Sequence, residues 1–245
     1  MSKKIALVTG GTGGIGTAIC RRLSDDGYVV VAASVNQEKA EAWKEAEKAS
    51  GYDFATVHID VGDFESCQQG YKQVAETLGP VAVLVNNAGI TRDGFMKKMS
   101  WEQWHEVLQT NLDSVFNMSK VCLEPMLEMK FGRIINISSI NGQKGQIGQA
   151  NYSAAKAGMH GFTKALAQET ARKGITVNTI SPGYIATDMI MKIDEPIRNQ
   201  IMEGIPVGRF GKPEEIARTV SFLADDEGGF ITGANLAING GQHMC

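Results

Sequence analysis

Residues 4–16, "KIALVTGGTGGIG", carry the clearest signal for the fold. A short apolar run typical of a buried parallel strand ends in a glycine-rich turn, and the helical pattern "IGTAICRRLSDDG" follows directly. Glycine lets the backbone turn tightly and approach a pyrophosphate, whose charge then lies at the amino end of the helix. This strand–turn–helix context favours a nucleotide site over an ordinary turn. We therefore expect phosphate contacts from the turn residues Gly10, Gly11, Thr12, Gly13, Gly14, Ile15 and Gly16.

Short β-rich runs alternate with helical runs along the rest of the chain. The helical runs are expected at 15–27, 37–51, 64–78, 101–130 and 152–173, and the strands at 4–10, 28–34, 53–60, 81–89, 132–139, 174–183 and 235–240. Seven strands separated by helices imply parallel pairing, because each crossover needs room for a helix. The sequence predicts an α/β fold, with residues 1–245 forming a single doubly wound Rossmann domain around a seven-stranded parallel sheet.

One segment interrupts this alternation. Residues 182–213 are rich in proline and glycine, and a connection of this length is usually functional or mobile. We expect a substrate lid at about 183–212, with short helices near "IDEPIRNQIMEG". The alternative is a surface excursion without a role.

The composition is that of an ordinary globular protein. The 245 residues are 43% hydrophobic and 21% charged, with a net charge of -3, so nothing suggests a nucleic-acid partner. Four scattered cysteines without C-x-x-C spacing indicate free thiols and no metal site: Cys20, Cys67, Cys122 and Cys245. The amino end lacks a signal-peptide pattern, and no run approaches the ~20 apolar residues of a membrane helix. We expect a cytoplasmic location and no membrane contact.

The end of the second predicted strand indicates which dinucleotide is bound. An NAD site usually carries an acidic residue about 20 residues beyond the glycine turn, where it bonds the ribose 2′-hydroxyl. Residues 33–36 read "ASVN" and hold no acid. A 2′-phosphate would meet no like charge there, and Ser34 or Asn36 can donate to it. Lys39 is a candidate cationic partner, or a solvated helix residue. The pattern favours NADPH/NADP+ over NAD.

Tyr152 and Lys156 lie one helical turn apart in "SSINGQKGQIGQANYSAAKAG", residues 138–158, so they share a helix face. A free phenol has a pKa of about 10, and an opposite charge nearby lowers it by roughly 1–3 units. The pair is therefore a candidate proton donor to a ketone. Ser139, at the end of a strand, can bond the developing alkoxide. The alternatives are two surface side chains and a turn serine.

With these motifs the chain resembles the short-chain dehydrogenase/reductase family over essentially its whole length. The motifs are "TGGTGGIG", "NNAG" at 86–89, "YSAAK" at 152–156 and "SPG" at 181–183. The resemblance implies that Asn111 completes the catalytic set of Ser139, Tyr152 and Lys156 by fixing a water behind the lysine. It also selects Ser139 over Ser138, which it leaves structural.

The resemblance also implies the remaining cofactor contacts. It places Asp60 and Val61 at the adenine, and Lys156 on the nicotinamide ribose beside Tyr152. The "NNAG" loop closes the adenine-ribose side, and the segment after "SPG" borders the nicotinamide, through Asn87, Ala88, Gly89, Pro182, Gly183, Ile185 and Thr187. The sequence departs from many NADP-dependent relatives at Gly13, where they carry a basic residue.

Within the family, the chain is most similar to reductases that act on acetoacetyl-CoA in polyhydroxyalkanoate synthesis, through "NNAGITRD", "NGQKGQIGQANYS" and "SPGYIATDM". The similarity implies NADPH-dependent reduction of a 3-oxoacyl-CoA to the (R)-3-hydroxyacyl-CoA in polyhydroxybutyrate biosynthesis. Two alternatives stay open: the same chemistry on an acyl-carrier-protein thioester, and a nucleotide-sensing regulator without catalysis. Long helical runs apolar on more than one face need a second partner, and the family suggests a homotetramer.

The substrate contacts follow from position along the chain. Gln146 and Gln149 lie between Ser139 and Tyr152, so their amides are expected to face the acyl chain. Tyr184 is expected to cover the ketone. Asp93 and Lys98 lie near the site mouth, where Lys98 either meets a coenzyme A phosphate or is simply solvated. His105 and His160 have no carboxylate or serine nearby in the sequence, so both are expected to be structural.

Overall fold

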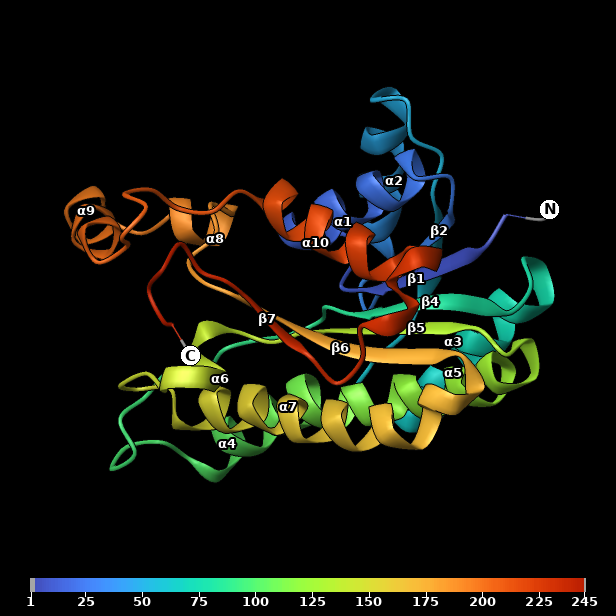
Figure 1. Cartoon of the computed structure of the whole chain (residues 1–245). Coiled ribbons are helices and arrows are strands. Elements are labelled where there is room, and N and C mark those ends of the chain that lie inside the picture. Colours follow the sequence, from blue (N-terminus) through green and yellow to red (C-terminus); the bar gives the residue numbers. More distant parts are fainter. Residues whose placement is uncertain (1–2, 245) are drawn as a thin grey trace.

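A seven-stranded parallel sheet forms the centre of the computed structural model, which describes residues 3–244 (Figure 1). The strand order is β3-β2-β1-β4-β5-β6-β7, and every neighbouring pair is parallel. The strands are β1 Ile5–Thr9, β2 Val29–Ser34, β3 Ala55–His58, β4 Val81–Asn86, β5 Gly132–Ile137, β6 Ile175–Pro182 and β7 Asn235–Ile238. The predicted α/β class, seven strands and parallel pairing are confirmed.

Helices cover both faces of this sheet (Figure 1). One face carries α1 Gly14–Asp25, α2 Gln37–Ala49 and α10 Pro213–Ala224, and the other carries α3 Phe64–Thr77, α5 Ser114–Met129 and α7 Ala150–Thr170. Each face has its own apolar cluster. Val8 packs with α1 and α10 residues on the first face, and Leu7 packs with α5 and α7 residues on the second. Burial on both faces explains why the central strands read as continuous apolar runs.

The chain order places a crevice beside β1. The chain first builds β2 and β3 on one side of β1, and then starts again with β4 on the other side. The loops that follow β1 and β4 leave the sheet at its carboxyl edge in opposite directions, which is where doubly wound folds bind ligands. The glycine turn and the "NNAG" loop therefore meet at this point.

The predicted helical run at 101–130 contains a change of helix type. It consists of α4 Trp101–Leu108, a π-helical segment Gln109–Asp113 and then α5. Ser100 and Gln103 form a capping box that starts α4. The widened turn brings Asn111 inward, and π-segments of this kind are frequent at functional sites. The apolar periodicity of the sequence did not reveal this turn.

The proline- and glycine-rich connection contains two short helices, α8 Asp188–Met191 and α9 Glu195–Glu203, as expected. They extend away from the sheet beyond its carboxyl edge (Figure 1). Ile185 pairs with Gly211 at the base of the segment, which brings its two ends together. The shorter elements are α6 Ile140–Lys144 and the 3-10 turns Ala171–Lys173 and Asp226–Phe230.

The cysteines Cys20, Cys67 and Cys122 are buried free thiols, whereas Cys245 lies outside the described residues. Burial raises the pKa of all three thiols, so they are poor nucleophiles. Within residues 3–244, no helix has the length and apolar character that a bilayer crossing requires. The same residues contain no group of three or more His, Cys, Asp or Glu side chains arranged to hold a metal ion.

Candidate active site

The glycine turn leaves the amino end of α1 open to a ligand. Gly13 is the N-cap residue and has no side chain to occupy the first-turn N–H groups. Gly10 has a φ of 59°, the left-handed region that favours glycine, and its carbonyl accepts the Gly13 N–H at 3.2 Å. Gly16 lies so close beneath this carbonyl that a Cβ atom would be 2.2 Å from it. The turn therefore presents backbone donors to an anion, as its sequence predicts.

A side-chain lock joins the glycine turn to the "NNAG" loop. The Thr9 hydroxyl accepts the N–H groups of Asn87 and Ala88 at 3.0 and 3.1 Å. The Asn87 amide donates in return to the carbonyls of Thr9 and Gly10 at 3.0 and 3.1 Å. Sequence reasoning missed Thr9, although a lone polar residue at the end of an apolar strand was the available signal.

At the end of β2, some of the polar groups that the sequence offered to a ligand already form hydrogen bonds within the chain. Asn36 caps α2 by accepting the Lys39 N–H at 2.8 Å, and Ser34 Oγ accepts the Asn36 N–H at 3.2 Å. A depression of about 340 Å³ lies here, lined by Val35, Asn36, Gln37, Glu38 and His58. Glu38 is an acid just beyond the window 33–36 in which none was found.

Asp60 and Val61, the residues expected at the adenine, are held in the fold by hydrogen bonds. Asp60 Oδ1 accepts the Gly62 N–H at 2.9 Å, and the Val61 backbone carbonyl accepts from the Asn117 side-chain amide at 3.0 Å. Both residues follow β3 at the carboxyl edge of the sheet. The structure thus places them on the same side of the crevice as the end of β2.

The four candidate catalytic residues converge although they come from three parts of the chain. The Asn111 amide bonds both backbone groups of Ile90 at 2.8 Å. A Cβ atom at Gly89 would lie 3.2 Å from Asn111 Oδ1 and 3.4 Å from Lys156 Nζ, so this glycine lets the two side chains approach one another. Lys156 Nζ lies 5.6 Å from the Tyr152 ring centroid.

The electrostatics of this group differ from the sequence-based expectation. Burial raises the pKa of Tyr152; a hydrogen bond with Ser139 opposes the rise and the charge of Asp93 adds to it. Burial also lowers the pKa of Lys156 to about 7. The expected lowering of the phenol pKa by Lys156 is therefore wrong for this arrangement, because desolvation dominates and the amine donates to Ile137 O at 2.8 Å. The phenol is held in its protonated form, which can donate a proton.

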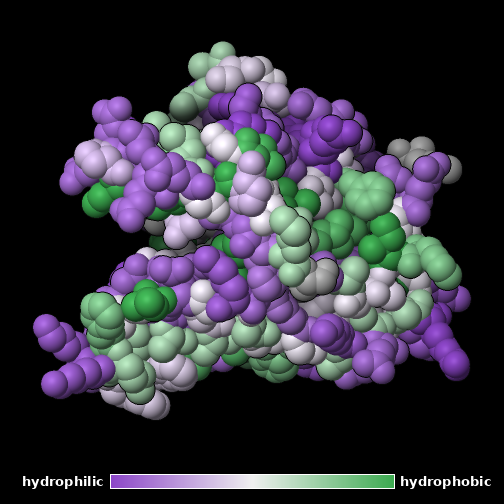
Figure 2. All heavy atoms as spheres, turned by 60° about the vertical axis from the view of Figure 1, so that its left-hand side comes forward, coloured by the Kyte–Doolittle hydropathy of each residue, from purple (hydrophilic) through white to green (hydrophobic). Residues whose placement is uncertain are grey.

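Two of the predicted substrate residues, Gln149 and Asp93, contact one another. Gln149 donates to Asp93 at 2.9 Å and accepts from Asn141 at 2.8 Å, so its amide links the start of α7 to the loop after β4. Lys98 and Gln146 are exposed. Three exposed apolar side chains share the same two loops: Phe95, Met96 and Ile147. Figure 2 shows a cleft on the side from which α8 and α9 extend.

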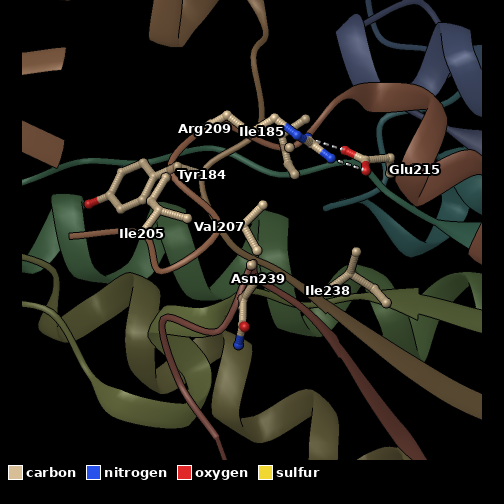
Figure 3. A pocket seen from close by; sticks show the side chains of 10 residues that line it. Tyr184, Ile185, Ile205, Val207, Arg209, Glu215, Ile238 and Asn239 are labelled. Atoms are coloured by element: carbon tan, nitrogen blue, oxygen red, sulfur yellow. Dashed lines mark hydrogen bonds and ion pairs between the residues drawn. The ribbon is translucent and has the colours of Figure 1, made fainter. Parts of the chain in front are cut away.

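Tyr184 and Ile185 line a cavity of about 120 Å³ at the base of the 183–212 segment (Figure 3). Ile205 and Val207 lie beside Tyr184, and the Arg209–Glu215 ion pair closes one end of the cavity. The pair is bidentate, with nitrogen–oxygen distances of 2.8 and 2.7 Å. Thr187 forms the N-cap of α8, and a Cβ at Gly14 would lie 3.1 Å from its methyl group, so the segment expected to border the nicotinamide lies against the glycine turn.

His160 contacts two serines that lie far from it in the sequence. Its Nε2 lies 3.0 Å from Ser138 Oγ and 3.3 Å from Ser181 Oγ. The absence of a serine near His160 in the sequence therefore did not indicate what it contacts in the fold, and its expected structural role stays a prediction. Both serines are distant in sequence and reach α7 only because β5 and β6 end beside it.

Comparison with known proteins agrees with this geometry. The family model described as short chain dehydrogenase matches residues 4–198, well over half of the chain. This chain belongs to the short chain dehydrogenase family. Membership implies a nicotinamide dinucleotide as the cofactor, and the glycine turn, the Thr9–Asn87 lock and the crevice beside β1 fit such a group.

Several relatives of this short chain dehydrogenase align over their full length. It is 56% identical over 243 residues to an acetoacetyl-CoA reductase of Allochromatium vinosum, with 98% of this chain and 99% of the relative covered. It is 53% identical over 245 residues to an acetoacetyl-CoA reductase of Cupriavidus necator, with both chains covered completely. A 3-oxoacyl-[acyl-carrier-protein] reductase of Haemophilus influenzae is 45% identical over 246 residues, with both again fully covered.

Proposed function

We propose that this protein is an acetoacetyl-CoA reductase that uses NADPH and forms the (R)-3-hydroxyacyl-CoA. The observation that carries the proposal is the convergence of Asn111, Ser139, Tyr152 and Lys156 beside the open phosphate turn. Full-length identity of 53–56% to acetoacetyl-CoA reductases supports the substrate class, against 45% for the acyl-carrier-protein reductase. We propose that this product is a precursor of polyhydroxybutyrate, so the pathway proposed for the enzyme is polyhydroxybutyrate biosynthesis.

The chemistry divides between the cofactor and the chain. The dinucleotide, when bound, supplies the hydride that forms the new C–H bond at the ketone carbon. Tyr152, held protonated by burial, gives its proton to the ketone oxygen. Ser139 bonds the same oxygen as negative charge develops on it. Lys156, whose pKa lies near 7, can return a proton to the phenolate. Asn111 holds the Ile90 backbone beside the lysine. We also propose that Asn111 binds a water molecule behind Lys156.

The preference for NADPH is supported by the residues at the end of β2. No acid occupies positions 33–36, and Ser34, Asn36 and Lys39 remain the proposed partners of the 2′-phosphate. Since the side-chain oxygen Oδ1 of Asn36 accepts the Lys39 N–H, the side-chain NH₂ group of Asn36 is the group left to donate. Glu38 lines the same depression, and its negative charge disfavours a bound phosphate. The positive charge of Lys39 must therefore offset that of Glu38.

The acyl-CoA is proposed to enter through the cleft beside the lid. Gln146, Gln149 and Tyr184 border the acyl chain in this proposal, while Asp93 orients Gln149. Lys98 is exposed and free to meet a coenzyme A phosphate. Phe95, Met96 and Ile147 are 67%, 73% and 81% exposed, and apolar surface of this kind suits a pantetheine arm.

The assembly is proposed to be a cytoplasmic homotetramer of single-domain chains. Phe64 on α3 stacks on Phe116 of α5, and both remain partly exposed, at 38% and 52%. Phe222 and Phe230 are exposed on the α10 side of the sheet, at 56% and 102%. Two apolar patches on opposite helical layers suit two different contacts between copies, which a tetramer with two-fold axes requires. Sedimentation at micromolar concentration tests this directly: a stable monomer contradicts it.

The runner-up function is reduction of the same ketone on an acyl carrier protein. Lys130 and Lys173 offer positive charge for an acidic carrier, and the 45% identical relative carries that name. A regulator without catalysis is disfavoured, because Tyr152 and Lys156 are both present and placed one turn apart on α7.

The deciding experiment measures NADPH and NADH oxidation with acetoacetyl-CoA and with acetoacetyl-acyl carrier protein. We expect the highest kcat/KM with NADPH and acetoacetyl-CoA. A higher kcat/KM with the carrier-protein substrate moves the function to the runner-up. Equal activity with NADH contradicts the cofactor proposal, and S34D is the matched variant, expected to favour NADH by repelling the 2′-phosphate. If no 3-oxoacyl thioester is turned over, the result favours the alternative of a nucleotide-sensing regulator without catalysis.

A further inference from the structure

The hydroxyl protons of Ser138 and Ser181 are both committed to oxygen acceptors. Ser138 Oγ donates to the Lys156 carbonyl at 2.8 Å, and Ser181 Oγ donates to Asn235 Oδ1 at 2.7 Å. A hydroxyl has a single proton, so neither serine can also donate to His160. His160 Nε2 must therefore carry the proton and share it between the two serine oxygens, at 3.0 and 3.3 Å. These hydrogen bonds fix the neutral His160 imidazole as the tautomer with its proton on Nε2.

This network lies directly behind the proposed catalytic residues. Ser138 precedes Ser139, and Ser181 precedes Pro182 on the nicotinamide side. The Ser138 N–H also donates to Ile180 O at 2.7 Å, so the ends of β5 and β6 are joined through backbone as well as side chains. Ser138 and Ser181 are 4% and 0% exposed, which leaves water little access to replace the histidine.

Two hydrogen bonds join Lys156 to the end of β5, one donated by the lysine and one accepted by it. The lysine Nζ donates to Ile137 O at 2.8 Å, while the next residue, Ser138, returns a hydrogen bond to the lysine carbonyl. These two bonds close a ring between the end of β5 and the first turns of α7. His160 lies one turn beyond Lys156 and bonds the serine of this ring. Burial lowers the pKa of His160, which keeps the imidazole neutral with its proton on Nε2.

We propose that His160 is a positioning residue for the reaction: its Nε2–H holds Ser138 and Ser181, and through them keeps Lys156 and Ser139 in register with the loop that begins at Pro182. The histidine touches neither substrate nor cofactor in this role. The inference rests on the proposed catalytic roles of Ser139 and Lys156. It predicts a defect in turnover rather than in binding, because the residues it orients act on the reacting atoms.

The test compares H160F with H160Q. Phenylalanine keeps an aromatic ring but has no donor, whereas the glutamine amide supplies an N–H at about the reach of Nε2. We expect H160F to lower kcat about tenfold, equivalent to ~1.4 kcal/mol in the barrier. The KM and the Kd for NADPH should stay within about twofold. H160Q should recover most of kcat. The exposed His105, changed to phenylalanine, is the matched control and should keep its kcat.

A double-mutant cycle and a spectroscopic measurement complete the test. S138A should reproduce the loss in H160F, and the double variant should lose little more, because both changes break one link. S138A also serves if H160F fails to fold. Equal kcat in H160F and wild type, equal loss in H160F and H160Q, or additive losses would overturn the inference.

Nitrogen NMR of the histidines, which needs no substrate, should find His160 protonated at Nε2, and an Nδ1–H tautomer would also overturn the inference. Turnover is measured with whichever 3-oxoacyl thioester the wild type reduces. A wild type inactive on acetoacetyl-CoA contradicts the proposed substrate, while unaltered kcat in the variants of an active enzyme contradicts only the role of His160.

Discussion

Gly16→Ala tests the close approach on which the phosphate turn depends. A Cβ atom at Gly16 would lie 2.2 Å from Gly10 O, 2.9 Å from Gly11 Cα and 3.0 Å from Asn87 Nδ2. Ordinary carbon–oxygen contacts are no shorter than about 3.3 Å, so the carbonyl must move by roughly 1 Å. Gly10 cannot yield freely, since its carbonyl accepts hydrogen bonds from the Gly13 N–H and the Asn87 amide at 3.2 and 3.1 Å.

The magnitude follows from these contacts. Overpacking costs about 1–3 kcal/mol, and weakening two hydrogen bonds costs about 1 kcal/mol each. Alanine also stabilises the folded state by about 1 kcal/mol through its higher helix propensity. The expected loss in the free energy of unfolding is therefore about 2–4 kcal/mol. Displacement of the turn also removes backbone donors from the phosphates, so the Kd for NADPH should rise at least about tenfold.

Urea unfolding and fluorescence titration with NADPH measure the two effects. Gly13→Ala is the matched control, because a Cβ at Gly13 meets only Gly10 O at 3.5 Å, an ordinary contact. Its loss of stability should stay below about 1 kcal/mol, the cost of an unsuited N-cap residue. Equal stability and equal NADPH affinity in the two variants would refute the argument that Gly16 is required by close packing.

Three further predictions concern the acid, its neighbour and the lid. Tyr152→Phe should lower kcat by about 10²–10⁴ with little change in NADPH affinity, and retention of more than about a tenth of the wild-type rate would exclude the phenol as the acid. Lys156 has a folded-state pKa of about 7, below its ordinary value of 10.5, so between these pH values the unfolded chain binds more protons and stability rises with pH. Relative to Lys156→Met, the wild type should therefore gain about 2 kcal/mol between pH 7 and 9 in urea unfolding, and a flat difference contradicts the shift. Glu215→Gln should cost less than about 1 kcal/mol of stability, because its ion pair with Arg209 is nearly half exposed, but it should raise the KM for acetoacetyl-CoA by loosening the base of the lid; an unchanged KM argues against that coupling.

Local sequence patterns were sufficient to predict the fold class and the glycine turn at which we propose that the cofactor phosphates bind. Both depend on local patterns: apolar strands alternating with helical runs, and a glycine turn between the first strand and helix. The spacing of Tyr152 and Lys156 likewise placed them on one face of α7, because helix geometry fixes the relation between residues four apart. The short helices of the 183–212 segment were foreseen from the same local pattern.

The relations between residues distant in the sequence could not be predicted, because they arise only when the segments pack. The π-turn that brings Asn111 inward, the Thr9–Asn87 lock and the contacts of His160 with Ser138 and Ser181 join segments that the strand order brings together. The pKa of Tyr152 also reversed its expected direction, because the sequence reveals a neighbouring charge one turn away but not how far both groups are withdrawn from water. Periodicity reports the conformation of each segment, whereas burial and long-range hydrogen bonds exist only after the segments pack.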